Sequence, residues 1–201
     1  MSQKEQFFKR KTDLYMLICA RRGELLFNSM KEKSEPPPLI TAVRRNDESE
    51  VIKLLSEGVT PNVVDSYGFT PLFWGIARRN PAIVRMLIEK GADVHARNSF
   101  GETPLMVASF MAMYEAVRLM IEKGAVVDAR NNYGMTSLMC AAQSDSPENE
   151  AIAVARLLLK NGADPSLQDR MKLTASDYAR YMGHHRMLRY LYHSLIFFDS
   201  T

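Results

Sequence analysis

The sequence has little that would support a disulfide framework, a metal site or a membrane span. Its 201 residues include only two cysteines, Cys19 and Cys140, which lie far apart and in no metal-ligand spacing. We expect both to be buried, reduced thiols of an intracellular protein. No run approaches the roughly 18 apolar residues of a membrane-spanning helix, and the N-terminus is charged where a signal peptide would be apolar. These absences favour a cytoplasmic and/or nuclear protein without membrane insertion.

The features of catalytic and nucleic-acid-binding proteins are also missing. The net charge of +3 is too small to indicate nucleic acid, although 46% hydrophobic residues are typical of a globular chain. No glycine-rich phosphate loop is present, and no paired carboxylate falls in a plausible cleft. Cys140 falls in an alanine-flanked helical stretch, and the sequence gives no reason to expect a base near it. His184, His185 and His193 have no companion ligand in their unit. We therefore expect no enzyme, no cofactor and no metal.

What the sequence does contain is a repeat. Gly68, Gly101 and Gly134 follow one another at a constant interval. A second series, Gly58, Gly91, Gly124 and Gly162, keeps the same interval until its last step, which is longer. A period of this length is typical of a solenoid, in which each unit stacks on the next.

One unit predicts two helices. Thr70 can cap a helix whose first residue is Pro71, and this helix should end near Arg79. Pro81 can open a second helix, which Gly91 would end in a left-handed conformation. Close stacking of the first helices is indicated by small residues at one recurring position: Ala42, Gly75, Ala108, Ala141 and Ala179.

Four-residue turns separate the units. Residues 65–68, 98–101 and 131–134 each place Asp or Asn first and Gly fourth, a composition typical of type I turns. Tyr67, Phe100 and Tyr133 occupy the same position in these turns. Solvated turn tips favour polar residues, so the aromatic side chains indicate either stacking between neighbouring hairpins or binding of a partner, and we favour binding.

These motifs resemble the ankyrin repeat family. The resemblance rests on the runs TPLF at 70–73, TPLM at 103–106 and TSLM at 136–139, and on Gly-Ala-Asp at 91–93 and 162–164. It implies an all-α solenoid of helix-turn-helix units joined by β-hairpin-like loops, with a concave face of inner helices and hairpins. We place a basic arm at 1–12, a degenerate capping unit and proline-rich linker at 13–35, and the repeat domain at 36–193. The repeats run over about 36–64, 65–97, 98–130, 131–168 and 169–193, followed by an apolar tail at 194–201.

The sequence departs from the family at several positions. Ile40, Phe73, Met106 and Met139 replace the histidine that usually follows the Thr-Pro-Leu triplet, so apolar contact must replace its hydrogen bonds. The fourth repeat carries an insertion around 144–150, which we expect to project as an acidic loop of either structural or functional origin. Lys172 and Ser176 replace Gly and Leu in the fifth unit, which indicates a cap.

The resemblance implies that partners are bound at the family's variable positions. Trp74 is equally compatible with the core, and the arginines with solvated helix ends. The predicted partner-binding residues are Tyr67, Phe69, Phe73, Trp74, Arg44, Arg45, Arg78, Phe100, Glu102, Phe110, Met111, Tyr133, Met135 and Met171.

The function that these positions imply is non-catalytic protein–protein interaction, as an adaptor, scaffold or inhibitor. We expect a monomer whose partner protein offers apolar anchors and acidic residues. Two alternatives stay open: a structural tether linking a membrane protein to the cytoskeleton, and an enzyme with an unrecognised site. The family also includes proteins hydroxylated at the loop position that Asn62, His95 and Asp128 occupy here.

Overall fold

A computed structural model describes residues 35–198, and for 194–198 only the course of the backbone. The predicted arm at 1–12, almost all of the predicted unit at 13–35, Cys19 and residues 199–201 lie outside the described residues. The described part is all-α, with ten helices and no strand. None of these helices is long and apolar enough to span a bilayer.

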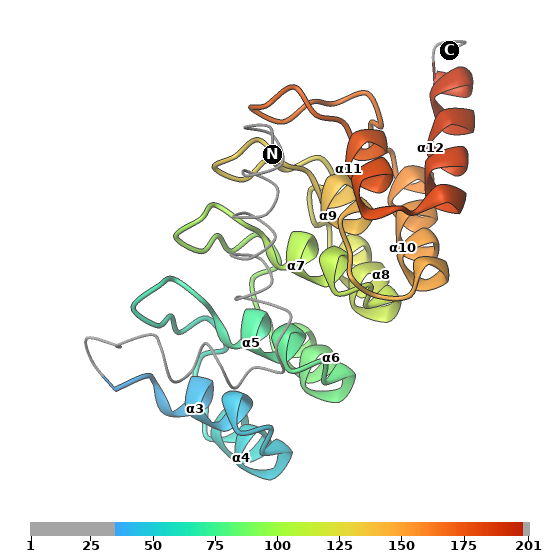
Figure 1. Ribbon diagram of the computed structural model, residues 1–201. Coiled ribbons are helices and arrows are strands. Elements are labelled where there is room, and N and C mark those ends of the chain that lie inside the picture. The colour runs from blue at the N-terminus through green and yellow to red at the C-terminus, as the bar shows by residue number, and fades with distance from the viewer. Residues whose placement is uncertain (1–34, 199–201) are drawn as a thin grey trace.

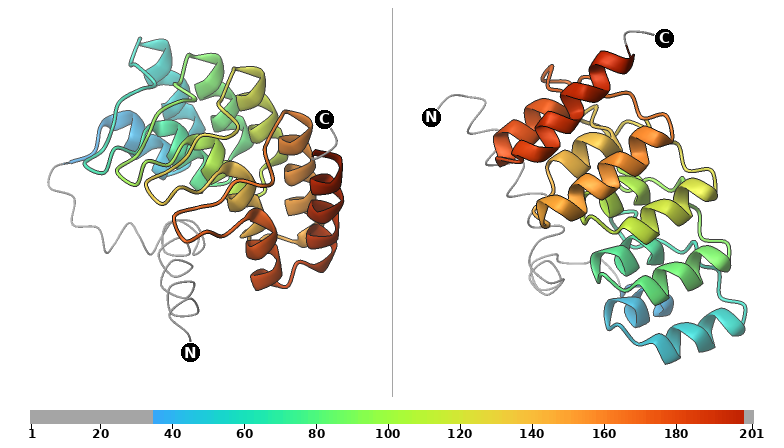
Figure 2. Two further views of the ribbon diagram at one scale, coloured as in Figure 1. Left: turned by 90° about the horizontal axis from the view of Figure 1, so that it is seen from above. Right: turned by 90° about the vertical axis from the view of Figure 1, so that its right-hand side faces the viewer.

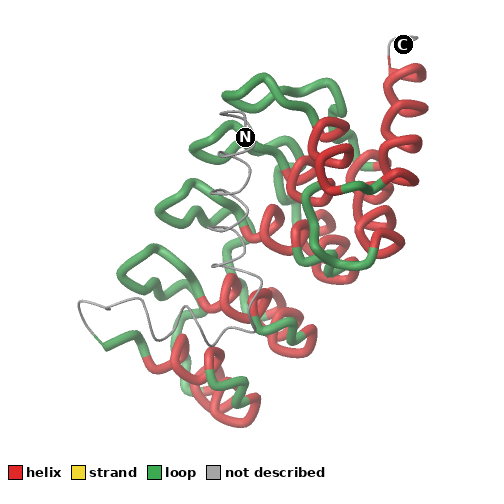
Figure 3. The backbone as a smooth tube through the Cα atoms, in the orientation of Figure 1, coloured by secondary structure: helices red, strands yellow, loops and turns green. Residues whose placement is uncertain are grey.

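The helices form two rows that rise together through the molecule (Figures 1 and 2). The inner row contains α3 (Pro38–Arg44), α5 (Pro71–Ala77), α7 (Pro104–Phe110), α9 (Ser137–Ala142) and α11 (Ala175–Met182). The outer row contains α4 (Glu48–Ser56), α6 (Pro81–Glu89), α8 (Tyr114–Glu122), α10 (Glu148–Lys160) and α12 (His185–Phe198). Each inner helix contacts the next, as do the outer helices from α6 to α12. Between the pairs, hairpin-like loops project to one side (Figure 3).

Local signals set where the helices begin. The hydroxyl oxygens of Thr103 and Thr136 accept hydrogen bonds from the amides of Met106 and Met139, which satisfies donors of the first turn. Thr70 occupies the expected N-cap of α5, but its hydroxyl makes no such bond. The helix α5 ends at Ala77, slightly before the predicted end near Arg79, and α6 begins at Pro81 as predicted.

Small side chains allow the inner and outer rows to pack closely. A methyl group added to Gly75 would lie 3.3 Å from the Cγ2 atoms of both Ile83 and Val84. In the next repeat, Ala108 occupies the position of Gly75 and Ala116 that of Ile83. One repeat therefore combines glycine in the inner helix with isoleucine in the outer helix, and the next combines alanine with alanine, so that both fill the space between the rows. All four apolar residues that replace the family's histidine are buried: Ile40, Phe73, Met106 and Met139.

The insertion of the fourth repeat is largely folded into the stack. Ser144 and Ser146 are buried, and their hydroxyls donate hydrogen bonds to the carbonyl oxygens of Phe110 and Met111 at distances of 2.5 and 3.3 Å. The expectation of a projecting acidic loop was therefore wrong for residues 144–147, of which only Asp145 and Pro147 are exposed. Asn149 and Glu150 are also exposed, in the first turn of α10. The rest of the insertion lengthens α10, which has 13 residues where α8 has 9.

The lengthened α10 supports the last helix. One carboxylate oxygen of Glu148 accepts hydrogen bonds from the amides of Arg186 and Met187, at 2.7 and 3.1 Å. Met187 and Leu191 of α12 are fully buried. The helix α12 continues to Phe198, so it crosses the predicted boundary at residue 193 without a break.

Candidate functional site

The hairpin tips are built on one repeated carboxamide or carboxylate. The Oδ1 atom of Asp65 accepts hydrogen bonds from the amides of Tyr67 and Phe69, both at 2.9 Å. Asn98, Asn131 and Asp169 make the same pair of bonds in the following hairpins. Because a short side chain holds two amides at once, each tip has a defined conformation before any partner arrives.

Neighbouring tips are also joined to one another. The amides of Ser99, Asn132 and Arg170 each donate a 3.0 Å hydrogen bond to the carbonyl of the aromatic residue in the preceding tip, Tyr67, Phe100 or Tyr133. Arg97 adds a second link, because its Nη1 atom donates to the carbonyls of Gly101 and Arg130 at 2.9 and 2.8 Å. Arg130 repeats this arrangement with the carbonyls of Gly134 and Gln168. Sequence reasoning missed both arginines, although their equivalent positions in successive repeats were a signal.

The tip aromatics are partly available at the surface. Tyr67, Phe100 and Tyr133 are half-buried, as is Met171, and each packs against the core with part of its side chain. The hydrogen bonds between successive tips involve the backbone of these aromatic residues and not their rings. The backbones of neighbouring hairpins therefore align the tips.

Seven of the predicted partner-binding side chains are buried. Glu102 is only 2% exposed, and its Oε2 atom accepts a 2.8 Å hydrogen bond from Asn98. In each of these hairpins the residue that follows the turn glycine is buried, as Phe69, Glu102 and Met135 show. The seven buried residues are Phe69, Phe73, Trp74, Glu102, Phe110, Met111 and Met135.

Trp74 has a structural role. It is 6% exposed, and its indole Nε1 donates a 3.0 Å hydrogen bond to Oδ2 of Asp65, so it ties α5 to its own hairpin. Its ring also contacts the ring of Phe69. The guanidinium carbon of Arg44 lies 5.0 Å from the centre of the indole ring, which is within the range of a cation–π contact. Of the two readings of Trp74, its burial favours the core.

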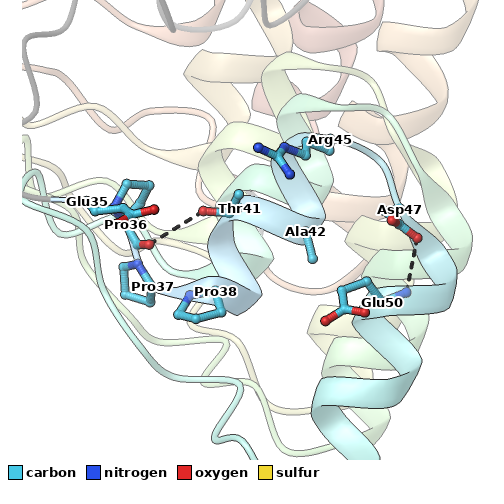
Figure 4. Close-up of a pocket in the computed structure, with 9 residues that line it drawn as sticks. All are labelled: Glu35, Pro36, Pro37, Pro38, Thr41, Ala42, Arg45, Asp47 and Glu50. Atoms are coloured by element: carbon cyan, nitrogen blue, oxygen red, sulfur yellow. Dashed lines mark hydrogen bonds between the residues drawn. The ribbon is translucent and has the colours of Figure 1, made fainter.

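The arginines lie toward one end of the inner row. Arg44 and Arg78 are half-buried and Arg45 is exposed. Figure 4 shows Arg45 at the edge of a hollow of about 670 Å³, together with the acidic residues Asp47 and Glu50 and the prolines that lead into α3. The three predicted arginines thus lie beside α3 and α5, where acidic side chains adjoin Arg45.

The fifth repeat closes the stack with a buried phenol. The hydroxyl of Tyr178 donates a 2.7 Å hydrogen bond to Oδ2 of Asp169, and burial together with this carboxylate raises the pKa of Tyr178 far above its ordinary value. Tyr178 therefore stays protonated at neutral pH and acts as a donor within the core. Cys140 is buried as well. Among residues 35–193, no group of three His, Cys, Asp or Glu side chains has the geometry to hold a metal ion.

Helix pairs that each contact only the next pair define a solenoid repeat protein. The comparison with known families specifies which kind. A family model described as ankyrin repeats (3 copies) matches residues 16–98 and 93–169, more than half of the 201 residues. The chain therefore belongs to the ankyrin repeat family, whose members are typically non-catalytic and mediate protein–protein interaction. None of the curated proteins matches the sequence.

Proposed function

We propose that this protein acts as an adaptor, scaffold or inhibitor that binds a segment of another protein along its hairpin tips and inner-helix face, without catalysing a reaction. The main support is the repeated tip geometry, in which Tyr67, Phe100 and Tyr133 stand in the same position on backbones that are already hydrogen-bonded. A preordered surface loses less conformational entropy when it binds. We also propose a monomer in the cytoplasm and/or nucleus.

The surface residues indicate the chemistry of the partner. Three aromatic anchors would contribute roughly 5 to 9 kcal/mol if fully buried, which is comparable to the cost of association of about 4 to 15 kcal/mol. The tips are already half-buried, so they alone would bind weakly. Arg44, Arg45 and Arg78 can supply the remainder by pairing with carboxylates. The proposed partner therefore combines apolar anchors with acidic residues.

A comparison of variants by quantitative pull-down tests this proposal. We expect the triple variant Tyr67→Ala, Phe100→Ala, Tyr133→Ala to lose at least one partner that the wild type retains. The control is Ile52→Ala with Val126→Ala, since these apolar side chains are more than half exposed and lie outside the tips. Circular dichroism must show that both variants are folded. A folded triple variant that retains every partner would overturn the proposal.

The pull-down and the purified protein also test the two alternative functions, the structural tether and the enzyme. Recovery of the cytoplasmic part of a membrane protein would favour the structural tether, provided that binding has no effect on any catalytic turnover by that protein. Chemical turnover by the purified chain would favour the enzyme instead.

A further inference from the structure

We infer that the protein carries a second binding site, on the outer row of helices, that takes an acidic segment of a partner protein. The site is a groove of about 410 Å³ between α8, α10 and α12. The helices that line it belong to the outer row (Figure 2), and no hairpin-tip residue lines it. The lining residues that carry the inference are Tyr114, Ile152, Leu157, Arg156, Lys160 and Arg186.

The groove has a structural origin in the insertion. Counted back from the glycines that follow the two helices, Gly162 and Gly124, Ile152 occupies in α10 the position that Tyr114 occupies in α8. Residues 148–151 therefore form an extra turn of α10 beyond the start of α8. Because this turn has no counterpart in α8, the outer row is uneven at this point, and Tyr114 is left 41% exposed beside it.

One face of α10 lines the groove. Ile152, Arg156 and Lys160 follow one another at i, i+4 spacing, which places them along the same side of the helix. Ile152 is buried and Leu157 half-buried, so the floor is apolar, while Arg156 and Lys160 are exposed. The guanidinium carbon of Arg156 lies 4.9 Å from the centre of the Tyr190 ring, which orients this cation.

The side chains that line the groove carry a net positive charge. No carboxylate lines it, and within residues 35–193 none of Arg156, Lys160 and Arg186 forms an ion pair. By contrast, Arg118 on the neighbouring α8 is paired with both Glu115 and Glu122. Glu148, at the start of α10, accepts hydrogen bonds from the amides of Arg186 and Met187, and its charge also interacts with that of Arg186, so Arg186 is partly compensated.

Arg186 also stands where a cation is unfavourable for the helix. It is in the first turn of α12, near the positive end of the helix dipole. A bound carboxylate would be attracted by the three cations, whereas the amides at this helix end already bond Glu148. Exposed cations on a flat helix face would be an ordinary solvated surface, but here they surround an apolar hollow.

This combination favours an acidic peptide over other anionic partners. The apolar floor and Tyr114 can accept one large apolar side chain, while carboxylates on either side meet the cations. Nucleic acid is less well matched, because three cations form no extended stripe and the chain has a net charge of only +3. A membrane surface would be met by a protruding apolar face rather than by a groove.

A binding measurement with the full chain tests the inference. The probe is a fluorescein-labelled peptide of glutamates flanking one leucine, and its comparator has glutamine in place of every glutamate. We expect Lys160→Gln with Arg186→Gln to weaken binding of the glutamate peptide by about tenfold, as the loss of two exposed charge contacts predicts. The matched control is Lys90→Gln with Lys123→Gln, which removes the same charge from exposed lysines that follow α6 and α8.

Further measurements locate the binding and check the fold. Tyr114→Ser should also weaken binding, whereas the triple tip variant should not. Trp74 is the only tryptophan and lies in the inner row, so its fluorescence should stay unchanged on addition of the peptide. Melting followed by circular dichroism shows whether each variant is folded.

Several results would overturn the inference. These are equal binding of the two peptides, equal affinity of the groove variant and its matched control, and a peptide that binds only to the hairpin tips. Binding of a single-stranded oligonucleotide or of phosphatidylserine vesicles through Lys160 and Arg186, without binding of the glutamate peptide, would assign the groove to that other partner.

Discussion

Asn62 and Asp128 occupy the same position in the loop after the outer helix, but they differ in the hydrogen bonds that they make. The amide of Asn62 donates to the carbonyl of Gly91 at 3.1 Å and its Oδ1 accepts from the amide of Asp93 at 2.8 Å. Asp128 stands at the same position two repeats later, but only its Oδ2 has a partner, the amide of Asp164 at 3.1 Å. Its Oδ1 is buried without a partner.

This environment raises the pKa of Asp128. Burial is the main cause and the charge of Asp164 adds to it, while the Asp164 amide and Arg130 act in the opposite direction. A carboxyl group whose pKa is raised in the folded state destabilises the fold above that pKa, and this penalty disappears as the pH falls and the group becomes protonated.

We expect Asp128→Asn to raise the free energy of unfolding by about 1 kcal/mol at neutral pH, because asparagine can supply the missing donor. Urea denaturation from pH 7 to about pH 4 measures this, and the gain should shrink toward acid as Asp128 takes up its proton. The reverse change, Asn62→Asp, is the control and should destabilise. A gain that is independent of pH would contradict the explanation.

The hairpin residue at the start of each turn shows why part of the site was not predictable. Sequence reasoning treats Asp and Asn there as equivalent turn formers. The structure distinguishes them by the inner-helix residue that each one faces: Asp65 and Asp169 accept hydrogen bonds from Trp74 and Tyr178. Asn98 instead donates a hydrogen bond to Glu102 with its amide, and the apolar Val107 stands where the second and fifth repeats have Trp74 and Tyr178. This pairing between hairpin and helix becomes visible only when the two are folded together.

At the scale of the elements, the helices and turns follow from local chemistry, whereas the directions of their side chains do not. The Thr-Pro starts and the turn glycines predicted the helix pairs, since capping and left-handed residues act within a few positions. Whether a residue such as Phe69 faces the core depends on how its hairpin folds against a helix, since its ring contacts those of Phe73 and Trp74 in α5. The inward path of Ser144 and Ser146 likewise depends on carbonyls at the end of α7, which belong to the preceding repeat.

Replacing a glycine should cost more stability in a hairpin tip than at the end of an outer helix, as Gly101 and Gly91 illustrate. Gly101 and Gly91 both have a positive φ, of 72° and 85°. A methyl group on Gly91 would meet nothing within 4 Å, whereas on Gly101 it would lie 2.4 Å from Oδ1 and 3.0 Å from the amide nitrogen of Asn132 in the next hairpin. The second contact involves backbone, so it is not relieved by a change of rotamer.

We therefore expect Gly91→Ala to lower the free energy of unfolding by about 1 kcal/mol and Gly101→Ala by about 2 to 3 kcal/mol. Urea denaturation at neutral pH compares the two, and Gly91→Ala serves as the control for backbone strain alone. Equal losses would show that the contact between neighbouring hairpins is not tight. Lys172 adopts a φ of 63° at the same position in the last hairpin, which shows that the strain alone is tolerated there.

At the scale of the whole molecule, the insertion joins the end of the solenoid to its body. Burial alone would raise the pKa of Glu148, but hydrogen bonds from the amides of Met187 and Arg186, and the charges of His184 and Arg186, lower it below its ordinary value. A carboxylate with a lowered pKa stabilises the fold above the ordinary pKa of about 4.3, and this contribution is lost as the pH falls through the lower folded value.

We expect Glu148→Gln to destabilise the packing of α12 by about 1 kcal/mol at neutral pH, because glutamine keeps an acceptor but loses the charge at the helix N-terminus. Hydrogen exchange of the α12 amides at pH 7 measures the effect. In urea denaturation near pH 3, where Glu148 is protonated, the free energies of unfolding of the variant and the wild type should become equal. Glu150→Gln is the control, since Glu150 is in the same first turn of α10 while the α12 amides bond Glu148. Equal effects of the two changes would assign the loss to α10 itself.

The side chain of Arg79 has a consequence for how the molecule comes apart. Its Nη2 atom donates a 3.0 Å hydrogen bond to Oγ of Ser146, so it reaches from the second repeat to the fourth and passes over the third. In an array where each unit touches only its neighbours, melting can start at either end and move inward one unit at a time. A bond that passes over a unit contributes about 0.5 to 1.5 kcal/mol to keeping three units together. The second, third and fourth repeats of this solenoid should consequently open as one block.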